Sequence, residues 1–366
     1  MEQKTPSKNN WLMTIWRTIR VPLLAILSAL LVGAVILLVS GADPLKAYAA
    51  LFKGAFGNAN YLKRTLEKTT PLIFAGLSVT FAFKAGLFNI GAQGQLLMGA
   101  ITAGFLGFAI KGLPPVLHIV LALLGGCAAG AFYGLIPGLL RSYSGAHEVI
   151  TTIMLNYIAI NLTDYLADGP WKDRSGTNVI ARLPLIEDSA RIPFFGPVPV
   201  GFIIAILIAF IIWYMLERTN FGFEINSVGL NSHASRYAGM KTKLLMTSAL
   251  VVAGLLAGFG GSVETLGVVG RFQPGFNAGL GFDGITVALL GRSNPFGVIL
   301  SSLLLGAMKG GANVMQFDAK VPHEIIDVIQ SMMLFFVTAD LVIRKLFRII
   351  KDTGGEVTLT AGWGQK

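Results

Sequence analysis

The chain has 366 residues, of which 54% are hydrophobic and only 13% are charged, whereas roughly 25% of the residues in an ordinary soluble domain are charged. This composition argues against a soluble globule and predicts a membrane protein. The single cysteine, Cys127, excludes an intramolecular disulfide and a thiolate cluster for a metal, and neither a metal nor a cofactor is expected. A net charge of +10 fits basic residues that flank membrane spans, so nucleic acid is not an expected partner.

Apolar stretches long enough to cross the hydrocarbon core, which takes about 20 residues, recur along the chain. They predict an all-α polytopic membrane protein with about ten transmembrane helices, some of them discontinuous. The first stretch, 21–39, is longer than the core of a signal peptide, so we expect a retained anchor, with a cleaved signal near Ser40 as the alternative. The other expected spans are 71–84, 87–110, 115–140, 149–167, 200–216, 245–264, 282–291, 295–315 and 325–343.

The distribution of Lys and Arg predicts the orientation of these spans. When both termini are cytoplasmic, the short outside loops keep only Lys111, Arg271, Lys309 and Lys320, in agreement with the positive-inside rule. This layout gives a cytoplasmic leader (1–20), a transmembrane domain (21–343) and a cytoplasmic tail (344–366). The domain has two external loops, 42–70 and 168–199, and one cytoplasmic connection, 217–244. Two inverted halves, about 71–167 and 245–343, lie on either side of the span 200–216 in the sequence.

The two external loops differ in composition. The first, 42–70, combines aromatic and basic residues and predicts an amphipathic element at the interface, whereas the second, 168–199, is rich in proline and mixed charges. Either loop serves as a simple connector or docks an external partner.

Glycines recur at every fourth residue within the expected span 115–140, at positions 126, 130, 134 and 138. Weaker repeats occur at 254 and 258 and at 306 and 310. Small residues at this spacing lie on one helix face and let a neighbouring backbone approach closely. The pattern favours close packing within one subunit over an interface between subunits.

The chemistry of known energy-coupling enzymes is absent from the sequence. No GxxxxGK[ST] loop occurs, so the chain does not hydrolyse ATP by that route. The GxGxxG match at 279–284 borders a span, and no acidic residue follows it at the spacing of about 20 residues that would hold a ribose, which indicates a glycine-rich helix break. The four scattered histidines and the lack of a GxSxG elbow argue against an enzyme. The acidic residues in or beside the spans all lie near expected span ends: Glu148, Asp164, Glu264, Asp283, Asp327 and Asp340. Proton-coupled carriers usually place such a residue in the membrane interior, so we expect another polypeptide to supply the driving force for transport.

Two motifs are unusually polar for their position. In the first, 86–95, Asn89, Gln93 and Gln95 lie between glycines, which predicts either a broken helix beside a translocation pathway or an ordinary turn. In the second, from His147 onward, three polar residues fall within about 40° on a helix and form a stripe that either bonds to another helix or faces the substrate pathway. These residues are Thr152, Asn156 and Thr163.

The connection 217–244 contains a short candidate helix. Asn231 or Ser232 can cap the start of this helix. One face carries the small residues Ala234 and Ala238, and the helix is expected to end at Gly239. Such a helix can occupy a groove of a cytoplasmic partner. The alternative, a helix on the membrane surface, has only Tyr237 as a large apolar side chain to insert.

The strings FNIGAQGQ, HEVITTIMLNYIA, VGLNSHASRYAGM and GFDGITVALLGRSNPFG together resemble permease subunits of bacterial ABC importers in the branched-chain amino acid and simple sugar superfamily. Within it the chain is most similar to nucleoside permeases of the guanosine type, over about residues 20–350. The resemblance implies a permease domain in the bacterial cell membrane that pairs with a second related permease. It also implies a cytoplasmic ATPase, an external substrate-binding lipoprotein and a nucleoside substrate.

The same resemblance guides the choice of site residues. It implies that contact with the ATPase involves Gly229, Asn231, Ala234, Arg236, Tyr237, Ala238 and Gly239. The expected substrate pathway comprises Asn89, Gln93, Gln95, Thr152, Asn156, Phe282 and Asp283. Simple sugars are the alternative substrate class, an ATP-independent secondary carrier is the alternative mechanism, and a membrane enzyme is a more distant possibility.

Overall fold

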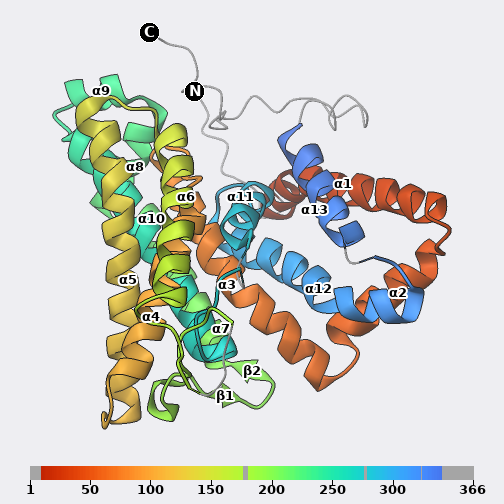
Figure 1. Ribbon diagram of the computed structural model, residues 1–366. Helices are drawn as coiled ribbons and strands as arrows, with labels where there is room; N and C mark the ends of the chain where they lie inside the picture. The colour runs from red at the N-terminus through yellow and green to blue at the C-terminus, as the bar shows by residue number, and fades with distance from the viewer. Residues whose placement is uncertain (1–9, 176–179, 276–277, 323, 340–366) are drawn as a thin grey trace, which may run out of the picture. The chain divides into compact units, whose positions relative to one another are not determined.

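The computed structural model describes residues 10–175, 180–275, 278–322 and 324–339, and this part of the chain is almost entirely α-helical (Figure 1). The chain divides into two compact units. Within the described residues, the first unit comprises 10–54 and 311–339, and the second comprises 55–310. Residues 1–9 of the expected leader, the end of the expected span 325–343 with Asp340, and the whole expected tail with Lys366 lie outside the described residues.

The first unit contains α1 (Asn10–Val39), most of α2 (Pro44–Phe56), the end of α12 (Pro295–Ala319) and α13 (Glu324–Thr338). Helices α1 and α13 pack together, and Gly33 leaves room for the side chain of Ile329 and for the hydroxyl of Tyr48. The Tyr48 hydroxyl donates a hydrogen bond of 2.7 Å to the carbonyl of Leu30 and joins α2 to α1.

The second unit contains the remaining elements. Its long helices are α3 (Ala59–Lys84), α4 (Ala92–Ala109), α5 (Pro115–Leu139), α6 (Glu148–Asp168), α7 (Val200–Arg218), α10 (Thr242–Glu264) and the first part of α12. Its short helices are α8 (Asn220–Leu230), α9 (Ser232–Tyr237) and α11 (Leu280–Leu290). The π-helices η1 (Leu140–Ser144) and η3 (Thr265–Val269) extend α5 and α10, and a 3₁₀ turn, η2 (Asp188–Ala190), precedes the paired two-residue strands β1 (Phe194–Phe195) and β2 (Val198–Pro199).

Helices α5 and α10 form the closest helix pair of the second unit and lie side by side (Figure 1). A Cβ atom on Gly130 would overlap the backbone of Gly254, and one on Gly134 would overlap the carbonyl of Leu250. The glycine pair on α12, Gly306 and Gly310, packs in the same way against Thr69 and Thr65 of α3. The predicted packing of the glycine repeats within one subunit is therefore confirmed.

Six helical segments are long and apolar enough to cross a membrane, within the described residues. They are Pro22–Val39, Pro115–Ser144, Glu148–Asp168, Val200–Arg218, Thr242–Val269 and Pro295–Ala319. The other expected spans correspond to helices α3, α4, α11 and α13, which are less apolar or shorter. An all-α polytopic architecture is confirmed.

The expected span 71–84 is too short, because α3 begins at Ala59 and contains 26 residues. The first turns of α3 carry basic and acidic side chains, which lower the mean hydropathy there. An apolar stretch in the sequence therefore marks only the second part of the helix. Asn58 caps the helix by accepting a hydrogen bond of 2.8 Å from the Tyr61 amide. The segment 42–70 is therefore helix α2 followed by the start of α3.

The segment between α6 and α7 lies against the helices and is not a free loop over its described residues. The amides of Leu183, Ile186 and Ile192 donate to the carbonyls of Phe272, Gly270 and Leu266 over 2.9–3.1 Å. The side chains of Leu183, Ile186 and Ile192 are buried. Backbone pairing of this kind gives an irregular segment a fixed position.

Helices α5, α6 and α7 expose large apolar side chains, as lipid-facing helices do. The exposed set includes Val116, Leu117, Val120, Leu124, Phe132, Ile150, Met154, Ile158, Ile203, Leu207, Phe210 and Ile211. Such apolar faces fit helices that contact lipid.

Candidate functional site

The turn between α3 and α4 is closed by a pair of side-chain amides. The Asn89 amide donates to Gln95 Oε1 over 2.8 Å, and the Gln95 amide donates to Asn89 Oδ1 over 3.2 Å. Asn89 also donates to the hydroxyl of Ser78 on α3 over 3.3 Å. Both amides are buried, so Asn89 and Gln95 satisfy each other and hold the first turn of α4.

Asn156 on α6 holds the same turn from a third helix. Its Oδ1 accepts a hydrogen bond of 2.8 Å from the Gly94 amide, and its Nδ2 donates over 3.0 Å to the Ile90 carbonyl. Asn156 is only 3% exposed. Of the two roles that the sequence left open for the polar stripe, the structure shows bonding between helices for Asn156.

The other members of the polar stripe bond within α6. The hydroxyl of Thr152 donates to the carbonyl of Glu148 over 2.7 Å, and that of Thr163 donates to the carbonyl of Ile160 over 3.0 Å. Both side chains are buried, and Thr152 lies against Gly91 at the turn before α4.

Gln93 joins α4 to α11. Its Oε1 accepts a hydrogen bond of 2.7 Å from the Gly281 amide, and a Cβ atom on Gly281 would overlap the Gln93 backbone. Gly279 has a φ of +86° directly before α11, whereas the rest of the predicted glycine-rich break, 280–284, is helical and forms the start of α11. The sequence Phe-Asn-x-Gly precedes both helices, at 88–91 and 276–279. The first turns of two broken helices therefore meet inside the second unit.

An ion pair lies beside this meeting point. The Nζ atom of Lys309 on α12 is 2.7 Å from Oδ2 of Asp283 on α11, and the side chains are 23% and 15% exposed. Phe282, the preceding residue, is 46% exposed. Glu264 near the end of α10 is 3% exposed. We call Phe282, Asp283 and Lys309 the α11–α12 polar site.

The sequence analysis missed Lys309 and misplaced Glu264. Lys309 was counted in an outside loop, but it lies within α12. Glu264 was placed at a span end, whereas the helical run continues through η3 to Val269. A lysine inside an otherwise apolar span was the signal that could have identified this site.

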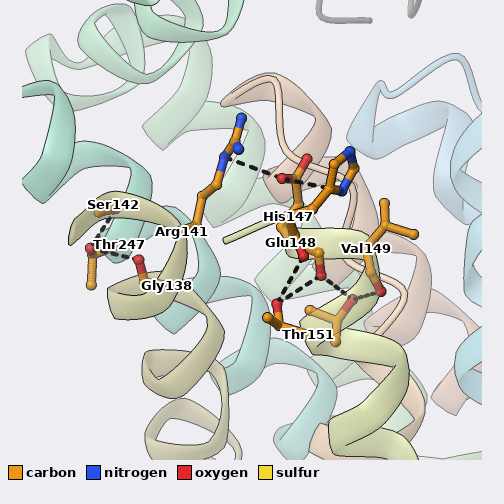
Figure 2. Close-up of polar contacts among 9 residues, drawn as sticks. Gly138, Arg141, Ser142, His147, Glu148, Val149, Thr151 and Thr247 are labelled. Atoms are coloured by element: carbon orange, nitrogen blue, oxygen red, sulfur yellow. Dashed lines mark hydrogen bonds and ion pairs between the residues drawn. The ribbon is translucent and has the colours of Figure 1, made fainter. Parts of the chain in front are cut away.

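The π-helix η1 connects α5, α6 and α10 through a separate set of contacts (Figure 2). Arg141 Nε is 3.2 Å from Oε2 of Glu148, and Glu148 is buried in the first turn of α6. The Thr247 hydroxyl on α10 lies 2.9 Å from the Ser142 hydroxyl and 3.2 Å from the Gly138 carbonyl. His147 is also within 4.0 Å of Glu148. These contacts fix the end of α10 that follows α9.

Helix α9 forms as the sequence predicts. Asn231 is its cap, since Oδ1 accepts a hydrogen bond of 2.9 Å from the Ala234 amide. The helix ends before Gly239, whose φ is +87°. Tyr237 is 94% exposed, and the small or basic residues Ala234, Arg236 and Ala238 are exposed as well.

Gly229 differs from the other residues expected to contact an ATPase. It lies at the end of α8 against the backbone of Lys84 and Gly86, where a Cβ atom would overlap the chain. The structure therefore gives Gly229 a packing role next to the turn that contains Asn89.

Apolar outer faces, broken helices that meet inside the fold and a short exposed helix between spans define a polytopic membrane transport protein. The chain belongs to the family described as the permease component of the branched-chain amino acid transport system, whose model matches residues 61–338.

Curated relatives cover nearly the whole chain. It is 40% identical to the guanosine ABC transporter permease protein NupP of Bacillus subtilis, over 91% of this chain and 97% of the relative. It is 37% identical to the nucleoside ABC transporter permease protein NupB of Lactococcus lactis, over 90% and 93% of the two chains. It is 34% identical to the glucose ABC transporter permease protein TsgB13 of Haloferax volcanii, over 93% and 92%.

Proposed function

We propose that this chain is the translocation subunit of an ATP-driven importer of nucleosides in the bacterial cell membrane. The meeting of two broken helices at Gln93 and Gly281, beside the α11–α12 polar site, is the observation that carries the proposal. Broken helices place polar groups at membrane depth only where protein or a wet cavity surrounds them. The similarity to NupP and NupB supports nucleosides as the substrate class.

A separate cytoplasmic ATPase drives the transport in this proposal. Helix α9 is its contact site, with Asn231, Ala234, Arg236, Tyr237, Ala238 and Gly239 at the surface or in the caps. An exposed tyrosine on a short, well-capped helix provides an anchor for a groove in a partner protein. In this proposal Gly229 acts indirectly, since it packs against the backbone of Lys84 and Gly86 at the end of α8.

The pathway itself is formed with a second, related permease, as a heterodimer. The five buried polar residues position the broken helices, and Phe282 and Asp283 contact the substrate. Partly exposed charges cannot face lipid without a large cost, which supports a partner or a wet passage over this side of the subunit. The positioning residues are Asn89, Gln93, Gln95, Thr152 and Asn156. An external lipoprotein delivers the nucleoside to the fixed segment between α6 and α7.

Both termini are cytoplasmic in this proposal. In a Cys127→Ser background, a cysteine at Ser175 reacts with an impermeant reagent from outside, and a cysteine at Ser232 reacts only after permeabilisation. The same layout places Asn178 outside the cell and Lys366 in the cytoplasm. Both positions lie outside the described residues. Labelling of position 175 only from the cytoplasmic side refutes the orientation.

Uptake into proteoliposomes tests the function. The full complex, with its ATPase and receptor, is reconstituted and supplied with labelled guanosine or glucose. We expect guanosine uptake that requires ATP hydrolysis. The similarity to TsgB13 makes a sugar the second candidate, and ATP-dependent uptake of glucose alone supports it. Guanosine uptake that survives loss of the ATPase and stops when the proton gradient collapses identifies a secondary carrier, and chemical change of the substrate identifies an enzyme.

A further inference from the structure

The hairpin of β1 and β2 differs in composition from the chain directly before it. Asp188 and Arg191 carry exposed charges, whereas no Asp, Glu, Lys or Arg occurs from Ile192 to Leu216. Two phenylalanines form β1, and the second of them, Phe195, is 77% exposed. Exposed apolar patches mark surfaces that contact another molecule or a membrane.

Hydrogen bonds fix the base of this hairpin. The Ile192 amide donates to the carbonyl of Leu266 in η3 over 3.1 Å. The Val200 amide, at the start of α7, donates to the Pro193 carbonyl over 3.3 Å. The tip of the hairpin, 195–198, therefore has a fixed position relative to the first turn of α7.

The backbone of the hairpin suits an apolar environment. Three of the residues from 193 to 199 are prolines, which have no amide hydrogen to donate: Pro193, Pro197 and Pro199. Non-helical backbone is costly in a membrane because an unpaired N–H group finds no water there. A hairpin with so few donors enters the layer between headgroups and acyl chains at a lower cost than an ordinary loop.

The length of α7 indicates where the hairpin lies along the membrane normal. The apolar part of α7, from Val200 to Leu216, is about 25 Å long at about 1.5 Å per residue. The hydrocarbon core is about 30 Å thick, so this part of the helix is about 5 Å short. Trp213 and Tyr214, at the far end of α7, are typical of the opposite interface. The apolar hairpin, at about 3.4 Å per residue, is long enough to fill the missing depth.

A lysine beside the hairpin indicates the level of the headgroups. The Nζ atom of Lys63, on α3, lies 4.0 Å from the centre of the Phe194 ring. Lysines near the ends of spans extend their ammonium groups to the headgroup layer, where anionic lipids attract them, while their stems cover apolar surface. A ring next to such an ammonium group lies at the boundary between headgroups and acyl chains.

We propose that the hairpin 193–199 inserts into the membrane interface of the leaflet opposite to α8 and α9, with Phe195 against acyl chains and Lys63 beside lipid phosphate. Its partner is the phospholipid surface, because the hairpin continues the exposed apolar side of α7, which includes Ile203 and Leu207. If a receptor were the partner, the phenylalanines would face water whenever the receptor leaves. The inference does not depend on which substrate the protein transports.

Fluorescence quenching in the full complex tests this insertion. In the Cys127→Ser background, the variants Phe195→Cys, Leu207→Cys and Asp188→Cys each carry one environment-sensitive fluorophore. The vesicles contain phosphatidylethanolamine and phosphatidylglycerol, with a nitroxide either near the lipid carbonyl or at the end of the acyl chain, and iodide is present on both sides. We expect the shallow nitroxide to quench position 195 most strongly and the deep nitroxide to quench position 207 most strongly. Iodide should quench position 188, because the Asp188 side chain is fully exposed.

Two results overturn the proposal. In the first, iodide quenches position 195 as strongly as position 188, which places Phe195 in water. In the second, position 195 becomes protected from iodide only after the purified receptor is added, which assigns the hairpin to receptor docking. Pro197 is exposed in the same turn, so Pro197→Cys supplies a second labelled position if Phe195→Cys does not assemble.

Discussion

Removal of the Asn156 side chain tests whether the buried amides hold the broken helix α4 in place. Asn156→Ala deletes both hydrogen bonds to the turn before α4, of 2.8 and 3.0 Å, and leaves the Gly94 amide and the Ile90 carbonyl without these partners. The bond to the Gly94 amide is buried and the bond to the Ile90 carbonyl is partly buried, so water replaces the first bond less readily than the second.

The expected magnitude follows from these two bonds. A hydrogen bond between helices in a membrane protein contributes about 0.6 kcal/mol on average and at most about 1.7 kcal/mol. A buried backbone group left unpaired costs about 1–3 kcal/mol. We therefore expect Asn156→Ala to lower the free energy of unfolding by about 2–4 kcal/mol. Asn156→Leu restores the lost volume but not the bonds, and it remains destabilised.

Asn161 provides the control on the same helix. Its amide donates to the Tyr157 carbonyl within α6 over 2.7 Å, and the side chain is exposed. Asn161→Ala should change the stability by no more than about 0.5 kcal/mol. Stability is measured by reversible unfolding of the purified permease in mixed micelles, and guanosine uptake is measured per folded complex.

Unfolding stability and guanosine uptake per folded complex together distinguish two roles for Asn156: positioning α4 for transport, or only stabilising the fold. Guanosine uptake per folded complex should fall several-fold, because the first turn of α4 also carries Gln93 and thereby contacts α11. Equal stabilities of Asn156→Ala and Asn161→Ala contradict the structural argument. Lower stability with unchanged uptake per folded complex removes Asn156 from the transport mechanism.

Three further predictions concern packing, coupling and acid stability. Gly130→Leu forces α5 away from Gly254 on α10, and we expect loss of the folded permease in a detergent solubility and thermal-melt assay. Arg236→Glu should weaken ATPase binding more at low than at high salt, measured by co-purification across ionic strength, because exposed charges are screened over about 8 Å at physiological salt; equal binding of variant and wild type contradicts this. The hydroxyl and amide of Ser175 hold the pKa of Asp173 below its ordinary value, so this carboxylate stabilises the fold above the unfolded pKa of about 3.9 and the contribution is lost as the pH falls through the lower folded pKa. Ser175→Ala should therefore move acid unfolding, followed by circular dichroism, to higher pH.

Much of the fold could be predicted from the sequence because its signals are local. The small helix α9 and its end at Gly239 follow from capping preferences and were predicted correctly, and of the two candidate caps, Asn231 and Ser232, the structure shows Asn231. The glycine repeats on α5 and α10 indicated close packing, since spacing by four residues places them on one face. These features depend on residues within two or three turns of one helix.

The arrangement of the polar residues could not be predicted in the same way, because their partners are far apart in the sequence. Asn156 bonds to Gly94 and Gln93 bonds to Gly281, across 62 and 188 positions. The sequence showed that each amide needed a partner or water, but not which one it has. Lys309 was missed as a site residue because the count of basic residues assigned it to an outside loop, whereas it lies within α12.

The polar residues around α4 and α11 differ in what they bond to. Asn89, Gln95 and Asn156 direct their amides at the protein, so few groups remain for contact with a passing ligand. A permease that receives cargo from a high-affinity receptor must also release it, and tight binding inside the pathway would slow that release. In the proposed function, Phe282 and Asp283 contact the substrate, and the buried amides hold α4 against α11 and α6. A pathway with few exposed polar groups would bind its cargo weakly, which favours release.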